Sequence, residues 1–214
     1  MRILRKPGTG STVPRRRLCA AWTVVPVPGL PRGVLLLLLL LLLSSCARIK
    51  PLPTLGAIPQ FDLISSTGQP FDSHILDGHI WVANFIYTTC DGPCPMMSHQ
   101  MRGIQNSTAT TPDVKLVSFT VDPVHDTPDV LDRYSKFFKA DGARWYFLTG
   151  EMSRLNDLGL KSFKLNGVNG DLSHSTRFVL VDPHRQMRGF YMSSDDDFPK
   201  RLLHDIRQLQ AEKS

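Results

Sequence analysis

The sequence predicts an α/β fold with a central mixed sheet flanked by helices. Two near-continuous apolar stretches, residues 79–87 and 114–122, are typical of strands that are buried on both faces of a sheet. Stretches with apolar residues at helical spacing follow them, so that the expected order of elements is β-α-β-α-β-α-β-β-α. The roughly 150 residues after position 60 are enough to form one hydrophobic core.

The first half of this body contains the first two buried strands. Phe61–Ile64, followed by "STGQPF", predicts a hairpin-like start. His79–Tyr87 is the first buried strand, and Pro95–Gln105 is a helix with proline in its first turn. Val114–Asp122 is the second buried strand. Because helices separate these strands, we expect the strands to run parallel in one sheet.

The second half continues the alternation. It comprises a helix with Thr127 as N-cap and Pro128 at its first position, a strand over Trp145–Gly150, a helix over Glu151–Ser162, a strand over His174–Pro183, its hairpin partner "QMRGFYM", and a closing amphipathic helix over Phe198–Gln210.

The motif "CDGPCP" follows the first buried strand directly and contains Cys90 and Cys94, with three residues between them. In sheets of this kind, sites form beyond the carboxyl ends of the parallel strands. The two cysteines lie at such an end, where strand meets helix, which is a thioredoxin-like arrangement. A helix N-terminus stabilises a thiolate and lowers its pKa. Because the thiolate is both nucleophile and metal ligand, this placement suits redox chemistry and metal binding alike.

The spacing distinguishes these roles in part. Thioredoxin-type redox motifs usually have two intervening residues, whereas three residues also let both sulfurs face one ion. Two soft thiolates suit Cu(I), and a third ligand is expected for Cu(II). His174, directly after the glycine-rich loop "NGVNGD", is the favoured candidate, and His125 is the next. We expect surface, turn or helix positions away from the thiols for His74, His79, His99, His184 and His204.

Two methionines and two aspartates lie near the motif, and a structural role competes with a functional one for them. Met96 and Met97 could offer thioethers to Cu(I), but on a helix after the motif they are more often core or rim residues. Asp122 could form a hydrogen bond to a metal ligand, although stabilising a turn or capping a helix is the commoner role for such an aspartate. Asp126 flanks the same turn.

The N-terminal residues have the composition of an export signal. Residues 1–45 hold seven basic and no acidic residues, and all seven precede the ten-residue apolar run Val34–Leu43. This run is too short for a membrane-spanning helix of about 20 residues. "LSSC" resembles the bacterial lipobox, in which the cysteine, here Cys46, carries lipid; an uncleaved signal anchor or cleavage near the serines are alternatives. We expect a signal over 1–45, a proline-rich tether over 46–60 and the folded domain over 61–214.

The charge pattern argues against nucleic acid as a partner. The chain has 25 basic and 19 acidic residues, but only 18 of the basic ones lie after residue 45. The folded body therefore has no basic excess, and it has no basic run with interleaved aromatic residues. With Cys19 removed in the signal and Cys46 lipidated, the exported chain keeps only Cys90 and Cys94 as free thiols, outside the cytosol, where disulfides persist.

Four segments together resemble the SCO/SenC family of thioredoxin-like copper chaperones: "CDGPCP", "TVDPVHDTPDVL", "WYFLTG" and "SHSTRFVLVDP". The resemblance runs from about Leu55 to the end of the body. It implies that Cys90, Cys94 and His174 bind one copper ion, Cu(I) or Cu(II), and that the protein helps to mature the binuclear copper centre of cytochrome c oxidase. Many members have a "CPDVCP"-like loop; Asp91 and Gly92 depart from it and affect redox potential, copper affinity and docking partner.

The sequence therefore favours an exported metallochaperone, lipid-anchored to a bacterial membrane with its domain on the non-cytoplasmic side. Its expected partner is the copper-bearing subunit of the oxidase or another copper protein. The main alternative is a thiol–disulfide oxidoreductase that uses only Cys90 and Cys94 and does not need His174. A peroxide-reactive protein and a structural disulfide are less favoured, because nothing marks a peroxidatic cysteine and so short a loop removes little chain entropy.

Overall fold

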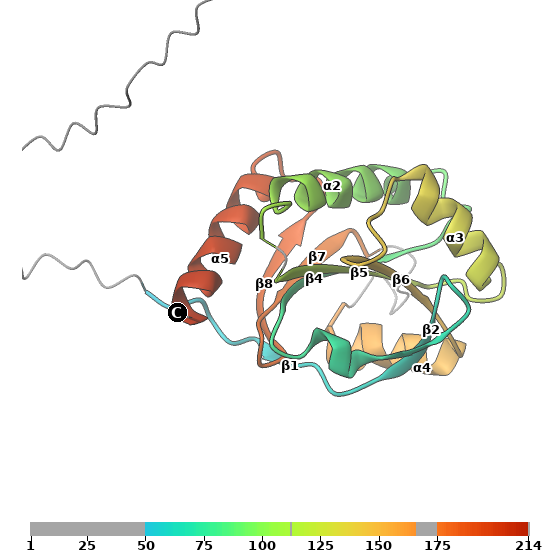
Figure 1. Cartoon of the computed structure of the whole chain (residues 1–214), viewed down its shortest axis with the longest axis horizontal. Helices are drawn as coiled ribbons and strands as arrows, with labels where there is room; N and C mark the ends of the chain where they lie inside the picture. Colours follow the sequence, from blue (N-terminus) through green and yellow to red (C-terminus); the bar gives the residue numbers. More distant parts are fainter. Residues whose placement is uncertain (1–49, 112, 166–174, 214) are drawn as a thin grey trace, which may run out of the picture. The chain divides into compact units, whose positions relative to one another are not determined.

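The computed structural model describes residues 50–111, 113–165 and 175–213. Its centre is an eight-stranded sheet with the strand order β1-β8-β7-β4-β5-β6-β2-β3, which confirms the predicted α/β class (Figure 1). The strands are β1 Gly56–Ala57, β2 Asp62–Ser65, β3 Pro70–Asp72, β4 Ile80–Ile86, β5 Val114–Thr120, β6 Trp145–Thr149, β7 Arg177–Val181 and β8 Gln186–Met192. The helices are the 3-10 turn η1 Ser73–Leu76, α2 Pro93–Ser107, α3 Pro128–Phe137, α4 Met152–Asn156, the π-helical η2 Asp157–Ser162, and α5 Phe198–Lys213.

The middle of the sheet is parallel, as expected from the helical connections. β4 pairs in parallel with β5 from Ile80↔Val114 to Ile86↔Thr120, and β5 pairs in parallel with β6. The outer strands β7, β8, β1, β2 and β3 pair antiparallel, which makes the sheet mixed. The carboxyl ends of β4 and β5 therefore meet at one edge of the sheet, and the motif with the two cysteines begins there.

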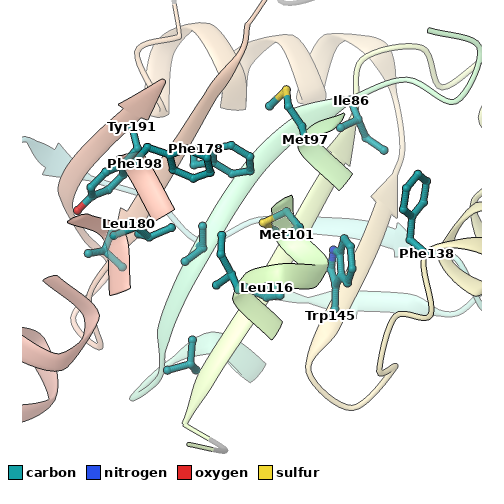
Figure 2. Close-up of a cluster of buried hydrophobic side chains, with 14 of the residues drawn as sticks. Ile86, Met97, Met101, Leu116, Phe138, Trp145, Phe178, Leu180, Tyr191 and Phe198 are labelled. Carbon is teal, nitrogen blue, oxygen red and sulfur yellow. The ribbon is translucent and has the colours of Figure 1, made fainter. Parts of the chain in front are cut away.

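Two hydrophobic cores cover the two faces of the sheet. Helices α2, α3 and α5 cover one face, and α4 with η2 covers the other (Figure 1). In β4, Val82 and Ile86 belong to the first core, whereas Trp81 and Phe85 belong to the second. This alternation follows the two-residue period of a strand and explains why residues 79–87 are almost entirely apolar. Figure 2 shows the first core, with Met97 and Met101 of α2 pointing at the sheet.

Some element boundaries differ from the sequence expectation. Helix α2 begins at Pro93, two residues earlier than predicted, because a proline without an N–H is well suited to the first helical position. The helix expected over Glu151–Ser162 changes to π-helical geometry at Asp157, and the N–H of Phe163 bonds to the carbonyl of Leu158 at 2.8 Å. The strand expected from His174 is observed as β7, Arg177–Val181; His174 lies outside the described residues.

The segment from Lys50 to Gln60, expected as part of a tether, lies along the folded body. The backbone N–H groups of Leu55 and Ile58 bond to carbonyls of β8 and its preceding turn at 2.8 and 2.9 Å. Arg188 donates from its Nη2 and Nε atoms to the carbonyls of Leu52 and Pro53 at 2.8 and 3.1 Å. These hydrogen bonds satisfy backbone groups that a proline-rich sequence cannot satisfy within the segment itself. Among the described residues, no helix is both long and apolar enough to cross a membrane.

Candidate metal centre

The two cysteines lie in the connection between β4 and α2. Strand β4 ends at Ile86, and the N–H of Cys90 bonds back to the carbonyl of Tyr87 at 3.3 Å, which closes a turn at the end of the strand. Cys94 is the second residue of α2. Both side chains are buried, with 6% and 3% of their surface exposed, and neither forms a disulfide. Strand end and helix N-terminus together therefore hold the sulfurs side by side.

The surroundings of Cys90 favour the thiolate. Burial opposes ionisation, but hydrogen bonds from the N–H groups of Cys94 and Gly92, from the Cys94 thiol and from the Tyr87 hydroxyl outweigh it, and the pKa of Cys90 is lowered. The two backbone donors, Gly92 and Cys94, lie at the N-terminus of α2, where N–H groups have no intrahelical partner, whereas Tyr87 directly follows β4. The prediction of a stabilised thiolate at the helix N-terminus is thus met at Cys90.

Cys94 behaves in the opposite way. Burial raises its pKa, and its hydrogen bond to Cys90 and the negative charges of Cys90 and Asp126 raise it further. A backbone hydrogen bond from Tyr87 opposes this shift without reversing it. The pair is consequently asymmetric at neutral pH, with one ionisable sulfur and one protonated sulfur, and binding of a metal ion to both must release the Cys94 proton.

A buried carboxylate supports the turn before Cys90. Asp126 follows β5 by six residues and is fully buried. It accepts hydrogen bonds from the N–H of Thr88 at 3.1 and 3.2 Å, from the Thr88 hydroxyl and from the Thr120 hydroxyl. The sequence placed Asp126 beside the turn but gave it no role, and it did not single out Tyr87. Both lie next to residues that the sequence did identify, yet only their side-chain contacts reveal what they do.

The other candidates from the sequence point elsewhere. His125 is 69% exposed and its Nδ1 lies 2.7 Å from Asp122 Oδ2, so that Asp122 pairs with this histidine. His99 is exposed and packs edge-on against Phe138. Met97 is completely buried in the core, whereas Met96 is 46% exposed at the start of α2.

His174, Cys46 and Cys19 lie outside the described residues, so their predicted roles stay predictions. Within the described part of the chain, no three His, Cys, Asp or Glu side chains form a group that could hold a metal ion. The donor set that is in place, two sulfurs of which one is readily ionised, is one that soft metal ions prefer. It is equally the donor set of a dithiol that can close to a disulfide.

Comparison with known proteins points to one family. The SCO1/SenC family model matches residues 52–211. A SCO1 protein homolog of Bacillus subtilis is 28% identical over 195 residues, covering 87% of this chain and 98% of the relative. A Stutzerimonas stutzeri protein named as copper-binding is 34% identical over 151 residues, covering 67% of this chain and 72% of that protein.

Solved structures of similar proteins share the fold. A SCO1/SenC family lipoprotein from Bacillus anthracis is 28% identical, with a TM-score of 0.68, and covers 75% of this chain and 99% of that structure. BsSco, described as a Sco-family cytochrome c oxidase assembly protein with a disulfide switch, is 27% identical, with a TM-score of 0.64. It covers 75% of this chain and 98% of that structure. The mixed sheet and its helices are thus the thioredoxin-like fold that the sequence predicted.

Proposed function

Because the chain belongs to the SCO1/SenC family, we propose that it is a membrane-anchored metallochaperone that delivers copper to, or prepares, the binuclear copper centre of cytochrome c oxidase. The observation that carries this proposal is the asymmetric pair of buried sulfurs, Cys90 and Cys94, at the N-terminus of α2. The copper-binding name of the S. stutzeri relative and the oxidase-assembly description of BsSco support it.

In this function, copper is the cargo, and three residues of the chain hold it. Cys90 provides a thiolate directly, Cys94 provides a second after losing its proton, and His174 provides an imidazole. Two thiolates and one imidazole suit Cu(I) and also complete a site for Cu(II). One ion is expected per chain. Release to a partner proceeds by exchange of these ligands, one at a time, for those of the recipient, the copper-bearing subunit of the oxidase or another copper protein.

The membrane anchor is part of the same proposal. Cys46 in "LSSC" carries lipid after removal of residues 1–45, and the domain lies on the non-cytoplasmic side of a bacterial membrane. The description of the B. anthracis neighbour as a lipoprotein supports this assignment. In the described structure, β1 pairs with the first residues of β8, and β8 is connected through β7 to Trp81 near the start of β4. The N-terminal segment therefore joins the body near the amino-terminal end of β4, whereas Cys90 follows the carboxyl end of that strand.

A second candidate function is a thiol–disulfide oxidoreductase that keeps the cysteines of a copper protein reduced. The specific observation in its favour is the difference between the two sulfurs. Cys90, whose pKa is lowered, attacks a disulfide as the thiolate and releases one of its sulfurs, and Cys94, after giving up its proton, then attacks the mixed disulfide and releases the second sulfur as a thiol. The description of BsSco as having a disulfide switch supports a redox role for the two cysteines.

Copper titration of the reduced full chain in detergent separates these functions. The variants are His174→Ala and the matched control His184→Ala, which removes an exposed histidine from the turn before β8. A metallochaperone binds one copper per chain, and the His174→Ala protein loses the Cu(II)–thiolate absorption while the control keeps it. Full copper occupancy in the His174→Ala protein contradicts the three-ligand site and leaves the dithiol as the functional group.

A further inference from the structure

Asp126 is an ionisable side chain in the protein interior, where a charge loses its hydration. It is completely buried, and no basic side chain in the described part of the chain forms an ion pair with it. A buried carboxylate costs several kcal/mol unless hydrogen bonds compensate its lost hydration. Asp126 accepts from three donors: the N–H of Thr88, which is shared between its two oxygens, the Thr88 hydroxyl and the Thr120 hydroxyl. An amide or a hydroxyl in its place could not accept all of these donors.

These hydrogen bonds connect two segments that are far apart in the sequence. Thr120 is the last residue of β5, and its register partner in β4 is Ile86, two residues before Thr88. Thr88 in turn lies two residues before Cys90 and is 38 residues from Asp126. The carboxylate therefore fastens the segment that leads into Cys90 to the end of the neighbouring strand.

The surrounding turn is arranged to present this carboxylate. The N–H of Asp126 bonds to the carbonyl of Asp122 at 2.9 Å, and the N–H of Asp122 bonds to the Thr120 hydroxyl at 2.9 Å. Helix α3 begins just afterwards, with Thr127 as N-cap and Pro128 at its first position, as predicted; the Thr127 side chain makes no capping bond. Capping of α3 thus does not account for the buried Asp126.

We propose that Asp126 is a positioning residue for the thiol pair, which fixes the turn of residues 87–90 so that the Cys90 sulfur faces that of Cys94. Its role toward copper rests on the proposed function above, whereas its role in the distance between the sulfurs does not. Its charge also reaches the pair: after burial and the contacts with Cys90, Asp126 adds to the causes that raise the pKa of Cys94. Position and charge act on the same two sulfurs.

The test compares Asp126→Asn with Asp129→Asn, which removes the same charge from an exposed position at the start of α3. The first readout is the equilibrium with glutathione, in which two glutathione molecules reduce the Cys90–Cys94 disulfide to two thiols and leave as oxidised glutathione. Without the hydrogen bonds to Asp126, the turn of residues 87–90 is less rigid, and the effective concentration of the Cys90 sulfur near the Cys94 sulfur falls. We therefore expect Asp126→Asn to shift this equilibrium about tenfold toward the dithiol, and Asp129→Asn to leave it unchanged.

The second readout is copper binding, for which we expect Asp126→Asn to weaken affinity about 10- to 100-fold with an altered Cu(II)–thiolate band. A merely structural Asp126 lowers the melting temperature but leaves the glutathione equilibrium and the band as in Asp129→Asn; that result overturns the proposal. If wild type binds no copper, the proposed function fails, while the glutathione equilibrium still decides the role of Asp126.

A second variant keeps the test decisive if Asp126→Asn does not fold. Valine has nearly the shape of threonine, so that Thr88→Val removes one hydroxyl donor of the turn and leaves the Asp126 side chain itself unchanged. We expect it to shift the glutathione equilibrium in the same direction by a smaller factor. A Thr88→Val protein that folds and has the wild-type equilibrium contradicts the proposal.

Discussion

The Cys94 thiol donates a hydrogen bond to the sulfur of Cys90. This contact lowers the pKa of Cys90 and raises that of Cys94, and burial adds to the rise at Cys94. Two residues of the same type, four positions apart, thereby acquire pKa values that are shifted in opposite directions. The difference matters for either candidate function, because thiolate is the form that attacks disulfides and binds metal.

The first prediction concerns the reactivity of the reduced thiols. Iodoacetamide should modify Cys90 well before Cys94, and the rate at Cys90 should rise with pH and level off below the ordinary thiol value of about 8.5. The sign follows from the lowered pKa: the thiolate is present above it and lost as pH falls through it. Mass spectrometry of the modified peptides identifies the site. Equal modification of both cysteines contradicts the asymmetry.

The second prediction separates two neighbouring methionines. Met97→Ala should destabilise the fold by about 2–5 kcal/mol, because it leaves a cavity beneath α2. Met96→Ala removes a half-exposed side chain and should change stability by no more than about 0.5 kcal/mol. Urea unfolding measures both. Copper binding by Met96→Ala should equal wild type, and a loss there would identify Met96 as a ligand.

The third prediction concerns two linked hydrogen bonds between buried polar side chains. Trp145 Nε1 donates to Ser118 Oγ at 3.0 Å, and Ser118 Oγ donates to Asn84 Oδ1 at 2.7 Å. Ser118→Ala leaves the indole N–H and the amide oxygen without this partner, at a cost of about 1–3 kcal/mol for each. Urea unfolding beside Ser153→Ala, an exposed serine of α4, measures it. Equal midpoints for the two variants would show that these groups find other partners.

The fourth prediction concerns the attachment of the N-terminal segment. Arg188 is 11% exposed, pairs with the buried Asp182 at 2.8 Å and holds the carbonyls of Leu52 and Pro53. Arg188→Ala should destabilise the fold by about 3–5 kcal/mol, since it leaves Asp182 without its cation. Arg201→Ala breaks only surface ion pairs and should cost less than about 1 kcal/mol.

A second readout of the same pair of variants tests the attachment itself. Limited proteolysis should cut Arg188→Ala between residues 50 and 55 much faster than Arg201→Ala, because the released segment is accessible to a protease. A cleavage rate equal to that of wild type would mean that the backbone bonds of Leu55 and Ile58 hold the segment without Arg188.

The fifth prediction concerns the proposed lipid anchor. Cys46→Ala should abolish incorporation of labelled fatty acid and move the protein out of the membrane fraction of a bacterial host, because the thiol is the site of lipid attachment. Cys19→Ala is the matched control, since this cysteine lies in the predicted signal and should be absent from the mature chain. Membrane retention of an unprocessed Cys46→Ala protein would favour the uncleaved signal anchor instead.

The sequence by itself determined the elements and the place of the thiols. The apolar runs of β4 and β5, the helical spacing of α3 and the prolines at positions 95 and 128 are local signals, each readable over a few residues. Because helices joined the buried strands, the parallel centre of the sheet followed, and with it the position of Cys90 and Cys94 at the carboxyl end of β4. Ligation by His174 and lipidation of Cys46 remain predictions.

Only the tertiary structure decided which of the two sulfurs ionises, and what fastens them. The pKa difference comes from burial and from donors of the α2 turn, whose distances depend on how strand and helix pack. Asp126 meets Thr88 across 38 residues because β4 and β5 are neighbours, and no local pattern encodes that contact. The same holds for residues 50–60, where prolines suggested a loose tether and Arg188, over 130 residues away, holds the segment on the body.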